Sequence, residues 1–359
     1  MNKRNVFLVL CAALLTASLA GCAEPAPEDI EDFGEKTKVS KVFTVSNTDE
    51  WAAAVKAIDG GGNDRNYVVN VTGPVDIPGL EGSTFSRPHS GVNISLRGTA
   101  PDAALVLSGK GSLIVLGEGE HLVLRDITLK GGEGNTAMLV YVGGGSTLTM
   151  KAGAEVSGNS NRLFNTDIES VRGGGVHVAA GAVFTMQGGI ISGNYDDGGY
   201  GGAGGGVYMA AGAVFTMEGG EISGNTSGSV GTGGGVYMTA NAVFTMEGGE
   251  ISGNTSDSGG GVCVDVDEDG GKGTFIMRGG TISGNEAFAG NHGAGGAGGG
   301  VSDGTFSLTG GIVHGSDGGD KANEARQGAS LYRDGGSAVY GDGSPIARGR
   351  AVNGTLTGR

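Results

Sequence analysis

A motif of 14 residues recurs almost unchanged along the second half of the chain. AVFTMEGGEISGNT stands at 213–226 and again at 242–255, and looser copies begin at Gly181, Lys272 and Thr305. The equivalent aromatic residues, spaced by 31, 29, 31 and 31 residues, are Phe184, Phe215, Phe244, Phe275 and Phe306. Internal repetition of this period predicts a solenoid, in which each unit buries its apolar face against the next. Because such a stack grows in one dimension, one domain is expected despite the length of 359 residues.

Each repeat contains three short strand-like segments separated by turns of small residues. In the copy that begins at Gly205, these segments are 207–209, 214–217 and 221–223. Side chains alternate along a strand, so one side of the unit collects the apolar residues Val207, Met209, Phe215, Met217 and Ile222. Three strands per coil with one face inward predict an all-β fold, a parallel β-helix. The clear repeats span 138–316, with degenerate coils on either side within 42–359.

Equivalent residues of successive coils should lie about 4.8 Å apart and form ladders. One apolar ladder is predicted to contain Val156, Ile191, Ile222, Ile251, Ile282 and Ile312. A polar ladder at a turn should contain Asn159, Asn194, Asn225, Asn254 and Asn285. Asparagine tolerates the left-handed conformation that turns need, and stacked amides can bond to one another. We interpret these asparagines as structural.

The repeat weakens toward the N-terminus, where strands are still expected at 67–71, 94–96, 105–107, 113–116, 122–124 and 127–129. Before them, 49–58 reads as a short amphipathic helix with Asn47 as its N-cap and Glu50 three residues later. An open stack would expose its first strand edge to other chains. We therefore predict that this helix caps the N-terminal end.

The first 22 residues read as a targeting segment. Lys3 and Arg4 precede an apolar run, 6–19, that is too short to span a bilayer, and the segment ends in Leu-Ala-Gly-Cys at Cys22. This ending resembles the bacterial lipobox, which implies cleavage before Cys22 and attachment of fatty acyl chains such as palmitate. Several acyl chains would hold the protein on a membrane. The alternative is an ordinary cleaved secretory signal.

The resulting organisation is a signal peptide at 1–21, an acidic flexible tether at 22–41 and the β-helix at 42–359. Cys11 leaves with the signal peptide and Cys22 carries lipid, so Cys263 alone remains and no intramolecular disulfide is expected. Ala23 after Cys22 lacks the aspartate that retains lipoproteins at the inner membrane in enteric bacteria. The expected location is the bacterial cell envelope, at the outer membrane or cell surface.

Composition excludes several classes of protein and of partner. The 78 glycines come with only 7 prolines, which argues against collagen, and the regular apolar residues argue against disorder. Net charge is −15, or −17 once Lys3 and Arg4 are removed. Nucleic acid is therefore not an expected partner.

The lipobox, the helix and the GGGVYM, FTMEGG and ISGN coils together resemble bacterial surface lipoproteins that carry a right-handed β-helix of the pectin-lyase-like superfamily. The glycine-glycine-aliphatic pattern at 205–208 and 234–237 is also partly similar to the repeats of polymorphic outer-membrane proteins. The resemblance implies a right-handed winding, in keeping with the usual hand of parallel crossovers. It also implies an adhesin-like role.

Insertions gather at one corner of the coil, between the asparagine and the next GGG, where loops run from 4 residues (255–258) to 13 (160–172). Ligand sites of solenoids usually lie along such an edge. The outward position of the neighbouring strand reads Tyr141, His177, Tyr208, Tyr237, Cys263 and Ser302. The four rings, Tyr141 to Tyr237, could bind a sugar or a peptide side chain. They could equally be an aromatic ladder that only stiffens the sheet.

Two acidic groups are further candidates. Asp265, Asp267 and Asp269 have the spacing of a calcium loop, although the twelfth position is Ile276 rather than glutamate. Calcium is thus the one cofactor considered, and an acidic hairpin is the alternative. Stacked glutamates, Glu218 with Glu247 and Glu221 with Glu250, could serve as paired carboxylates, but hydrated surface groups are the simpler interpretation.

Polysaccharide lyases of the similar fold need a basic residue beside calcium-binding acids, and the outward strand beside the loops offers no Lys or Arg. His177 could act as a base, yet a histidine in an aromatic row is more often packing. The sequence therefore favours a non-catalytic binding module for glycan or protein, adhesin-like and lipid-anchored. A purely structural surface lipoprotein is the second reading, and a polysaccharide lyase or hydrolase the third.

Overall fold

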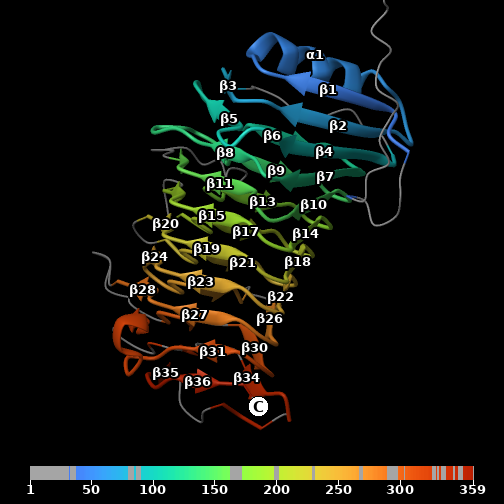
Figure 1. Ribbon diagram of the computed structural model, residues 1–359. Helices are drawn as coiled ribbons and strands as arrows, with labels where there is room; N and C mark the ends of the chain where they lie inside the picture. Colours follow the sequence, from blue (N-terminus) through green and yellow to red (C-terminus); the bar gives the residue numbers. More distant parts are fainter. Residues whose placement is uncertain are drawn as a thin grey trace, which may run out of the picture.

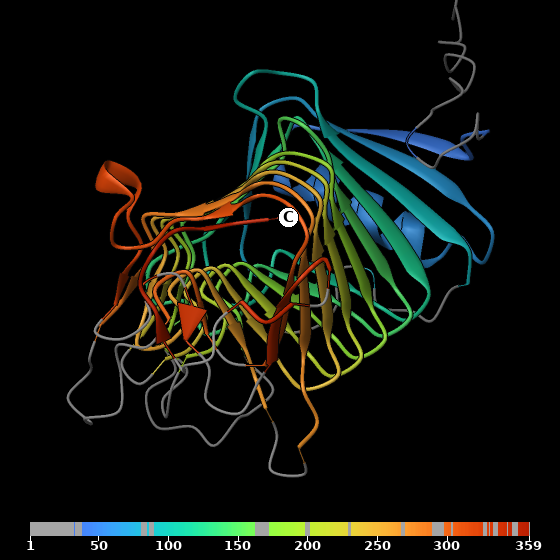
Figure 2. The same cartoon turned by 90° about the horizontal axis from the view of Figure 1, so that it is seen from below.

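The computed structural model describes residues 32, 38–79, 85, 90–161, 172–197, 202–228, 231–266, 270–288, 298–302, 304–325, 329, 331–332, 337–342, 344–346 and 351–358. Over these residues the chain is a parallel β-solenoid (Figure 1). Successive coils stack in register, and a view along the stack shows them superimposed (Figure 2). Cys22 and the segment 1–21 lie outside the described residues.

The first two sheets carry most of the regular structure. Sheet 1 consists of β1 (Lys41–Val45), β2 (Asn66–Val71), β4 (Val92–Gly98), β7 (Glu120–Arg125), β10 (Thr147–Met150), β14 (Val183–Met186), β18 (Val214–Met217), β22 (Val243–Met246), β26 (Thr274–Met277), β30 (Thr305–Leu308) and β34 (Ser337–Tyr340). Sheet 2 consists of β3 (Pro74–Ile77), β5 (Ala104–Leu107), β8 (Thr128–Lys130), β11 (Glu155–Ser157), β15 (Ile190–Ser192), β19 (Glu221–Ser223), β23 (Glu250–Ser252), β27 (Thr281–Ser283), β31 (Ile312–Val313) and β36 (Leu356–Thr357).

Two further sheets flank the corner where the loops are inserted. Sheet 3 has two-residue strands: β12 (Ser160–Asn161), β16 (Tyr195–Asp196), β20 (Thr226–Ser227), β24 (Thr255–Ser256), β28 (Glu286–Ala287) and β32 (Glu324–Ala325). Sheet 4 consists of β6 (Ile114–Leu116), β9 (Val140–Val142), β13 (Val176–Val178), β17 (Val207–Met209), β21 (Val236–Met238), β25 (Val262–Val264), β29 (Val301–Ser302), β33 (Leu331–Tyr332) and β35 (Ala351–Val352). The regular coils thus have four strands rather than the three expected, because the chain pairs again directly after each turn asparagine.

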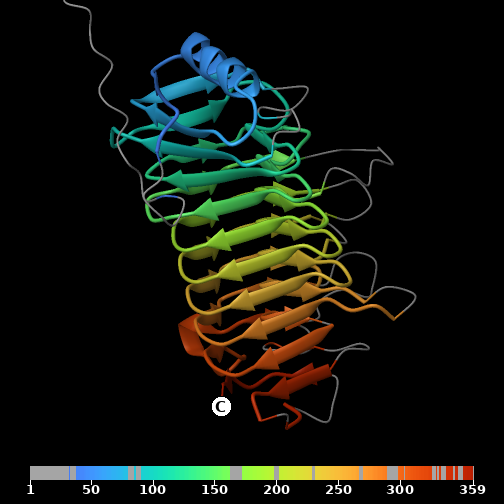
Figure 3. The same ribbon diagram turned by 90° about the vertical axis from the view of Figure 1, so that its right-hand side faces the viewer.

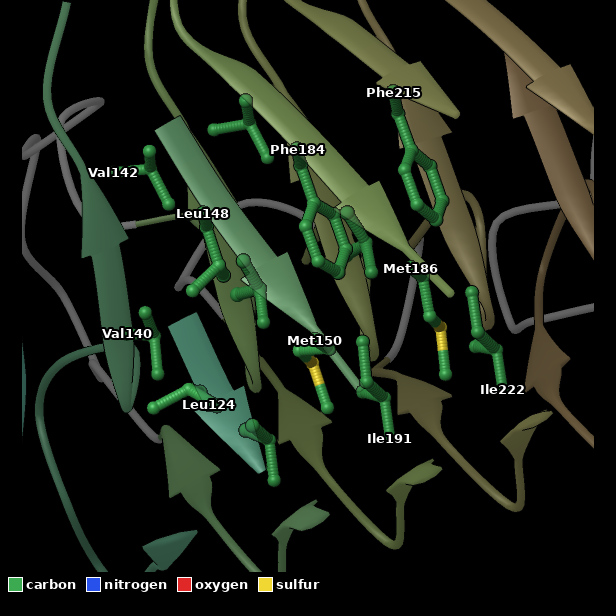
Figure 4. Packing of buried hydrophobic residues seen from close by; sticks show 14 of the residues in the cluster. Leu124, Val140, Val142, Leu148, Met150, Phe184, Met186, Ile191, Phe215 and Ile222 are labelled. Atoms are coloured by element: carbon green, nitrogen blue, oxygen red, sulfur yellow. The ribbon is translucent and has the colours of Figure 1, made fainter. Parts of the chain in front are cut away.

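The core is a set of apolar ladders, as the alternation predicts. Val207, Met209, Phe215, Met217 and Ile222 are all fully buried. The phenylalanines stack with ring centroids 4.5 to 5.1 Å apart from Phe184 to Phe306, and Figure 4 shows the first two of these rings beside the methionine and isoleucine ladders. One expected member was wrong: Val313, not Ile312, pairs with Ile282 and is buried.

The asparagine ladder is confirmed as a structural device. The Nδ2 groups of Asn194, Asn225 and Asn254 each donate to Oδ1 of the next asparagine at 2.9 to 3.0 Å, and that same oxygen accepts the donor's own backbone N–H. The ladder has two further members that the sequence pattern did not predict, Asn135 and Asn323. The left-handed residue is the preceding glycine, for example Gly224 with φ of 60°, and not the asparagine.

The N-terminal end is closed by a helix, as predicted. Helix α1 (Thr48–Asp59) lies across the first coil (Figures 1 and 3) and buries Trp51, Ala54 and Ile58. The side chain of Asn47 accepts the N–H of Glu50 at 3.0 Å, which satisfies one of the first-turn donors. Strand β1 precedes the helix and pairs with β2, so the sheet begins one strand earlier than expected.

The described part of the expected tether lies against the outer face of sheet 1. Val39 packs on Val68, and Lys38 and Ser40 bond to Asn66. Farther down, Asp32 accepts Ser95 Oγ at 2.6 Å and pairs with Lys151 Nζ at 3.0 Å. Burial acts to raise the pKa of Asp32, but the bonds from Ser95 and Lys151 outweigh it and hold the pKa below its usual value. Asp32 is therefore an anchoring point on the flank of the stack.

The C-terminal end closes differently. Here β36 pairs antiparallel with β31, and β35 pairs antiparallel with β33, so the chain reverses against the last coils. Leu331, Ala338 and Leu356 are buried there. Apolar residues of the last strands therefore form the C-terminal end of the core.

Candidate functional site

The predicted aromatic row exists and follows sheet 4. Strands β9, β13, β17 and β21 each point two valine or methionine side chains inward and one side chain outward, and the register stacks Tyr141, His177, Tyr208 and Tyr237. The ring centroids are 5.1, 4.7 and 5.5 Å apart. The same register extends the row to Val115 at one end and to Tyr332 at the other.

The row is less exposed than an outward position suggests. His177 and Tyr237 have relative exposures of 7% and 8%, and only Tyr141 and Tyr208 are half-buried. Tyr237 packs with Ala203 and Cys263, and Tyr208 packs partly against the same cluster. Any direct ligand contact in this row therefore falls to Tyr141 and Tyr208, with His177 held between them.

His177 is an uncharged member of the row. Its Nδ1 lies 2.8 Å from the carbonyl oxygen of Arg172, which can only accept, so Nδ1 carries the proton. Burial lowers the pKa of His177; the bond to the Arg172 carbonyl opposes that effect and the Arg172 charge adds to it. At neutral pH the ring therefore packs as a neutral donor.

Tyr237 joins the row to the acidic candidate site. Its hydroxyl donates to Asp265 Oδ2 at 2.8 Å. Burial raises the pKa of Tyr237, and the neighbouring Cys263 and Asp265 raise it further. Asp265 is thus engaged as an acceptor that fixes the tyrosine.

Of the three proposed calcium ligands, Asp265 is the one that lies within the described residues. Asp265 directly precedes Val266, which forms an antiparallel bridge with Lys272. Asp267 and Asp269 lie outside the described residues, so the calcium interpretation stays a prediction. Within the described ranges no three His, Cys, Asp or Glu side chains form a group that could hold a metal ion.

A carboxylate that the sequence analysis missed lies at the base of the loops. Asp196 on β16 is fully buried and accepts Asn161 Nδ2 at 3.0 Å, the N–H of Ala203 at 2.8 Å and the N–H of Gly173 at 3.3 Å. Burial raises its pKa to about 7, although the two N–H groups and Arg172 act in the opposite direction. Asp196 thereby connects β16 to Gly173, which lies before β13, and to Ala203, which lies before β17.

The signal for this residue was a departure from the repeat. The copy at 191–197 reads ISGNYDD, where the next two copies read ISGNTS. Tyr195 and Asp196 therefore occupy the positions of Thr226 and Ser227 in the next coil. A buried carboxyl group thus stands where the next coil has the hydroxyl of Ser227, which indicates a contact specific to this coil.

The stacked glutamates lie on a different part of the surface. Glu221 pairs in register with Glu250 at the corner between sheets 1 and 2. Arg278 bonds to Glu247 at 2.6 Å and Ser283 donates to Glu250 at 3.0 Å. Sheet 1 separates this corner from the aromatic row, so the two candidate groups do not form one site.

The comparisons with known proteins add no relative. The chain matches none of the protein families with which it was compared, and no curated protein is similar enough to be counted as a relative. Among the described residues, no helix is both long and apolar enough to cross a membrane. The lipid-anchor residue Cys22 lies outside the described residues and stays a prediction.

Proposed function

We propose that this protein is a lipid-anchored β-helix of the bacterial cell envelope that binds a glycan or a protein along its loop edge, without catalysis. The observation that carries the proposal is the continuous stack of Tyr141, His177, Tyr208 and Tyr237 beside the corner where loops of different length are inserted. Aromatic rings offer apolar faces with polar tips, and both sugars and peptides use such faces.

The right-handed winding, the pectin-lyase-like superfamily, the acyl chains on Cys22 and the place at the outer membrane or cell surface belong to the same proposal. They rest on the lipobox and on the resemblance of the coils. Replacing Cys22 with alanine should move the protein from the membrane fraction to the soluble fraction and abolish labelling by radioactive palmitate. Unchanged partitioning would contradict the anchor.

Binding is tested with the chain from residue 22 onward carrying Cys22→Ala, so that Asp32 keeps its contacts. This protein is mixed with envelope and host polysaccharides, with and without calcium, and the mixtures are separated by size. Intact polymer that elutes with the protein supports a binding module. Shortened polymer would instead indicate an enzyme.

The row is tested with substitutions that the stack already accommodates. Tyr141→Val copies Val115 and Tyr208→Ser copies Ser302, each from the same register row. The double variant should lose binding, whereas Val214→Thr, on the exposed face of sheet 1, should keep it. Undiminished binding by the double variant would exclude the row as the site.

A mainly structural role is the second candidate, because burial of His177 and Tyr237 is what a stiffening ladder needs. In that case the parent protein would bind none of the polysaccharides. The double variant would only lower the midpoint of thermal unfolding.

A further inference from the structure

The tether is held on sheet 1 at two places that are built differently. Near the N-terminal end, Val39 packs on Val68, and the backbone N–H of Ser40 donates to the carbonyl oxygen of Asn66 at 2.7 Å. Farther along the stack, among the described residues of the tether, the side chain of Asp32 makes the second contact. The first contact therefore continues the pairing of the sheet, whereas the second is a contact of one side chain.

Three neighbouring strands of sheet 1 supply the partners of Asp32. Ser95 lies in β4, Arg125 ends β7, and Lys151 directly follows β10. The Asp32 carboxylate accepts the Ser95 hydroxyl at 2.6 Å and lies 3.0 Å from Lys151 Nζ and 3.6 Å from Arg125 Nη1. The Asp32 side chain is 4% exposed, but those of Lys151 and Arg125 are 25% and 45% exposed. The flank of sheet 1 thus carries a built carboxylate site whose cationic groups reach solvent.

Two outward side chains of sheet 1 are buried at this site. Ser95 and Val123 pair in register, and because side chains alternate along a strand, both point away from the core that their neighbours fill. They are 0% and 4% exposed, whereas Thr149, the next residue of the same row, is half-buried. The bond from Ser95 shows that Asp32 lies over this row, which accounts for the burial.

The two contacts differ in what their opening would leave behind. Release of Asp32 returns the Ser95 hydroxyl and the two cationic groups to water, so no polar group stays buried without a partner. Ion pairs of partly exposed side chains contribute little net stability. Release of Ser40 would instead break a backbone hydrogen bond and uncover Val39 and Val68. The contact at Asp32 is therefore the one that can open while the sheet stays intact.

We propose that the tether is a strap with a closed and an open position, and that Asp32 is the latch that holds it closed. Its consequence rests on the lipid anchor of the proposed function. Opening moves the first described contact of the tether from Asp32 to Lys38, whose carbonyl oxygen accepts Asn66 Nδ2. This adds six residues, up to about 20 Å, to the segment between the lipid and the domain. The latch thus sets how far the domain can move from the membrane.

The latch is tested by thiol labelling of Val123→Cys in the Cys22→Ala chain, which needs no membrane. The native Cys263 is buried, and the Cys22→Ala chain without Val123→Cys gives its background rate. With Asp32 in place the introduced thiol should react slowly, because the closed strap covers it. We expect Asp32→Asn and, separately, Lys151→Gln to raise the labelling rate at least tenfold. Circular dichroism of each variant shows whether the fold is kept.

The matched control is Asp126→Asn, the same chemical change at an exposed carboxylate that pairs with the same Arg125 at 3.2 Å. It should leave the labelling of Val123→Cys as slow as before. An equal labelling rate with and without Asp32→Asn, whether fast or slow, would overturn the latch. The anchor is tested separately by the membrane partitioning of Cys22→Ala, so failure of the latch and failure of the anchor are distinguishable.

Discussion

Glu120 shows what a single buried carboxyl group costs in this fold. It is fully buried at the start of β7, with Oε2 accepting the N–H of Gly117 at 2.9 Å. Among the described residues no donor reaches Oε1. Burial raises the pKa of Glu120 to about 8, the Gly117 bond opposes this, and the negative charge of Asp59 adds to the rise. Folding therefore takes up a proton here at neutral pH.

The sign of the pH dependence follows directly. The folded state holds a proton on Glu120 between about pH 4.5 and pH 8 while the unfolded state does not, so the free energy of unfolding falls as pH rises through that window. With about 1.4 kcal/mol per pKa unit, the loss should be roughly 2–4 kcal/mol. Glu120→Gln should remove this loss, as measured by urea unfolding at pH 5, 7 and 8.5.

The same chemical change at an exposed glutamate provides the control. Glu218→Gln should give a stability curve parallel to that of the parent protein. If Glu120→Gln also ran parallel to the parent, Glu120 would be charged in the folded state and its assignment as a neutral group would be wrong.

At the scale of strands and ladders, the sequence predicts what depends on repetition. Strands β1, β3 and β33 to β36 were not predicted, and the helix follows from its N-cap and its amphipathic pattern. The other strands of sheets 1, 2 and 4 and the phenylalanine ladder follow from periodic apolar residues whose neighbours in space are copies of themselves. The two-residue strands of sheet 3 did not, because Ser160–Asn161 and Tyr195–Asp196 carry no alternation long enough to detect. They form because the asparagine ladder fixes the backbone just before them.

The candidate site was predictable in its position but not in its exposure. The stacking of Tyr141 through Tyr237 follows from register alone. Burial of Tyr237 depends on Ala203 and Cys263 from neighbouring segments, and these contacts do not repeat from coil to coil. Likewise, Asp196 is buried through Asn161, Gly173 and Ala203, whose approach no local pattern encodes.

The phenylalanine stack gives a prediction at this scale. Phe244 is fully buried between Phe215 and Phe275, with centroids at 4.5 and 4.7 Å. Phe244→Ala should lower the free energy of unfolding by about 3–5 kcal/mol because it leaves a cavity. Phe244→Leu should cost about 1.5 kcal/mol or less, since Leu148 already occupies this ladder beside Phe184. Equal losses in urea unfolding would contradict the ladder interpretation.

For the whole molecule, the two ends are the places where a stack of strands would otherwise recruit other chains. Helix α1 covers the N-terminal end, and the antiparallel strands β35 and β36 lie at the C-terminal end. Short reversed strands offer few unpaired backbone groups to a neighbour. The coils between these ends depend mainly on nearest neighbours, so the stack should tolerate a change in their number.

Deletion of residues 214–242 tests this modularity. It removes one whole coil of 29 residues and brings β14 beside β22, which matches Phe184 with Phe244. The shortened chain should fold cooperatively, with far-ultraviolet circular dichroism typical of strands and a length about 4.8 Å shorter by small-angle scattering. Deletion of 214–227 removes a partial coil and should prevent folding, and a folded product of that deletion would contradict the model of independent coils.

The docking of Asp32 has a consequence for how the protein would stand on a membrane. With lipid on Cys22, as proposed, only nine residues of the tether separate the anchor from Asp32. This part of the tether can span at most about 35 Å. Asp32 is held on the flank of sheet 1, by Ser95 and Lys151, and not at the end of the stack that helix α1 covers. An anchor at this point would therefore hold the stack by its side and not by its end, so that the flank of sheet 1 is the part brought toward the bilayer.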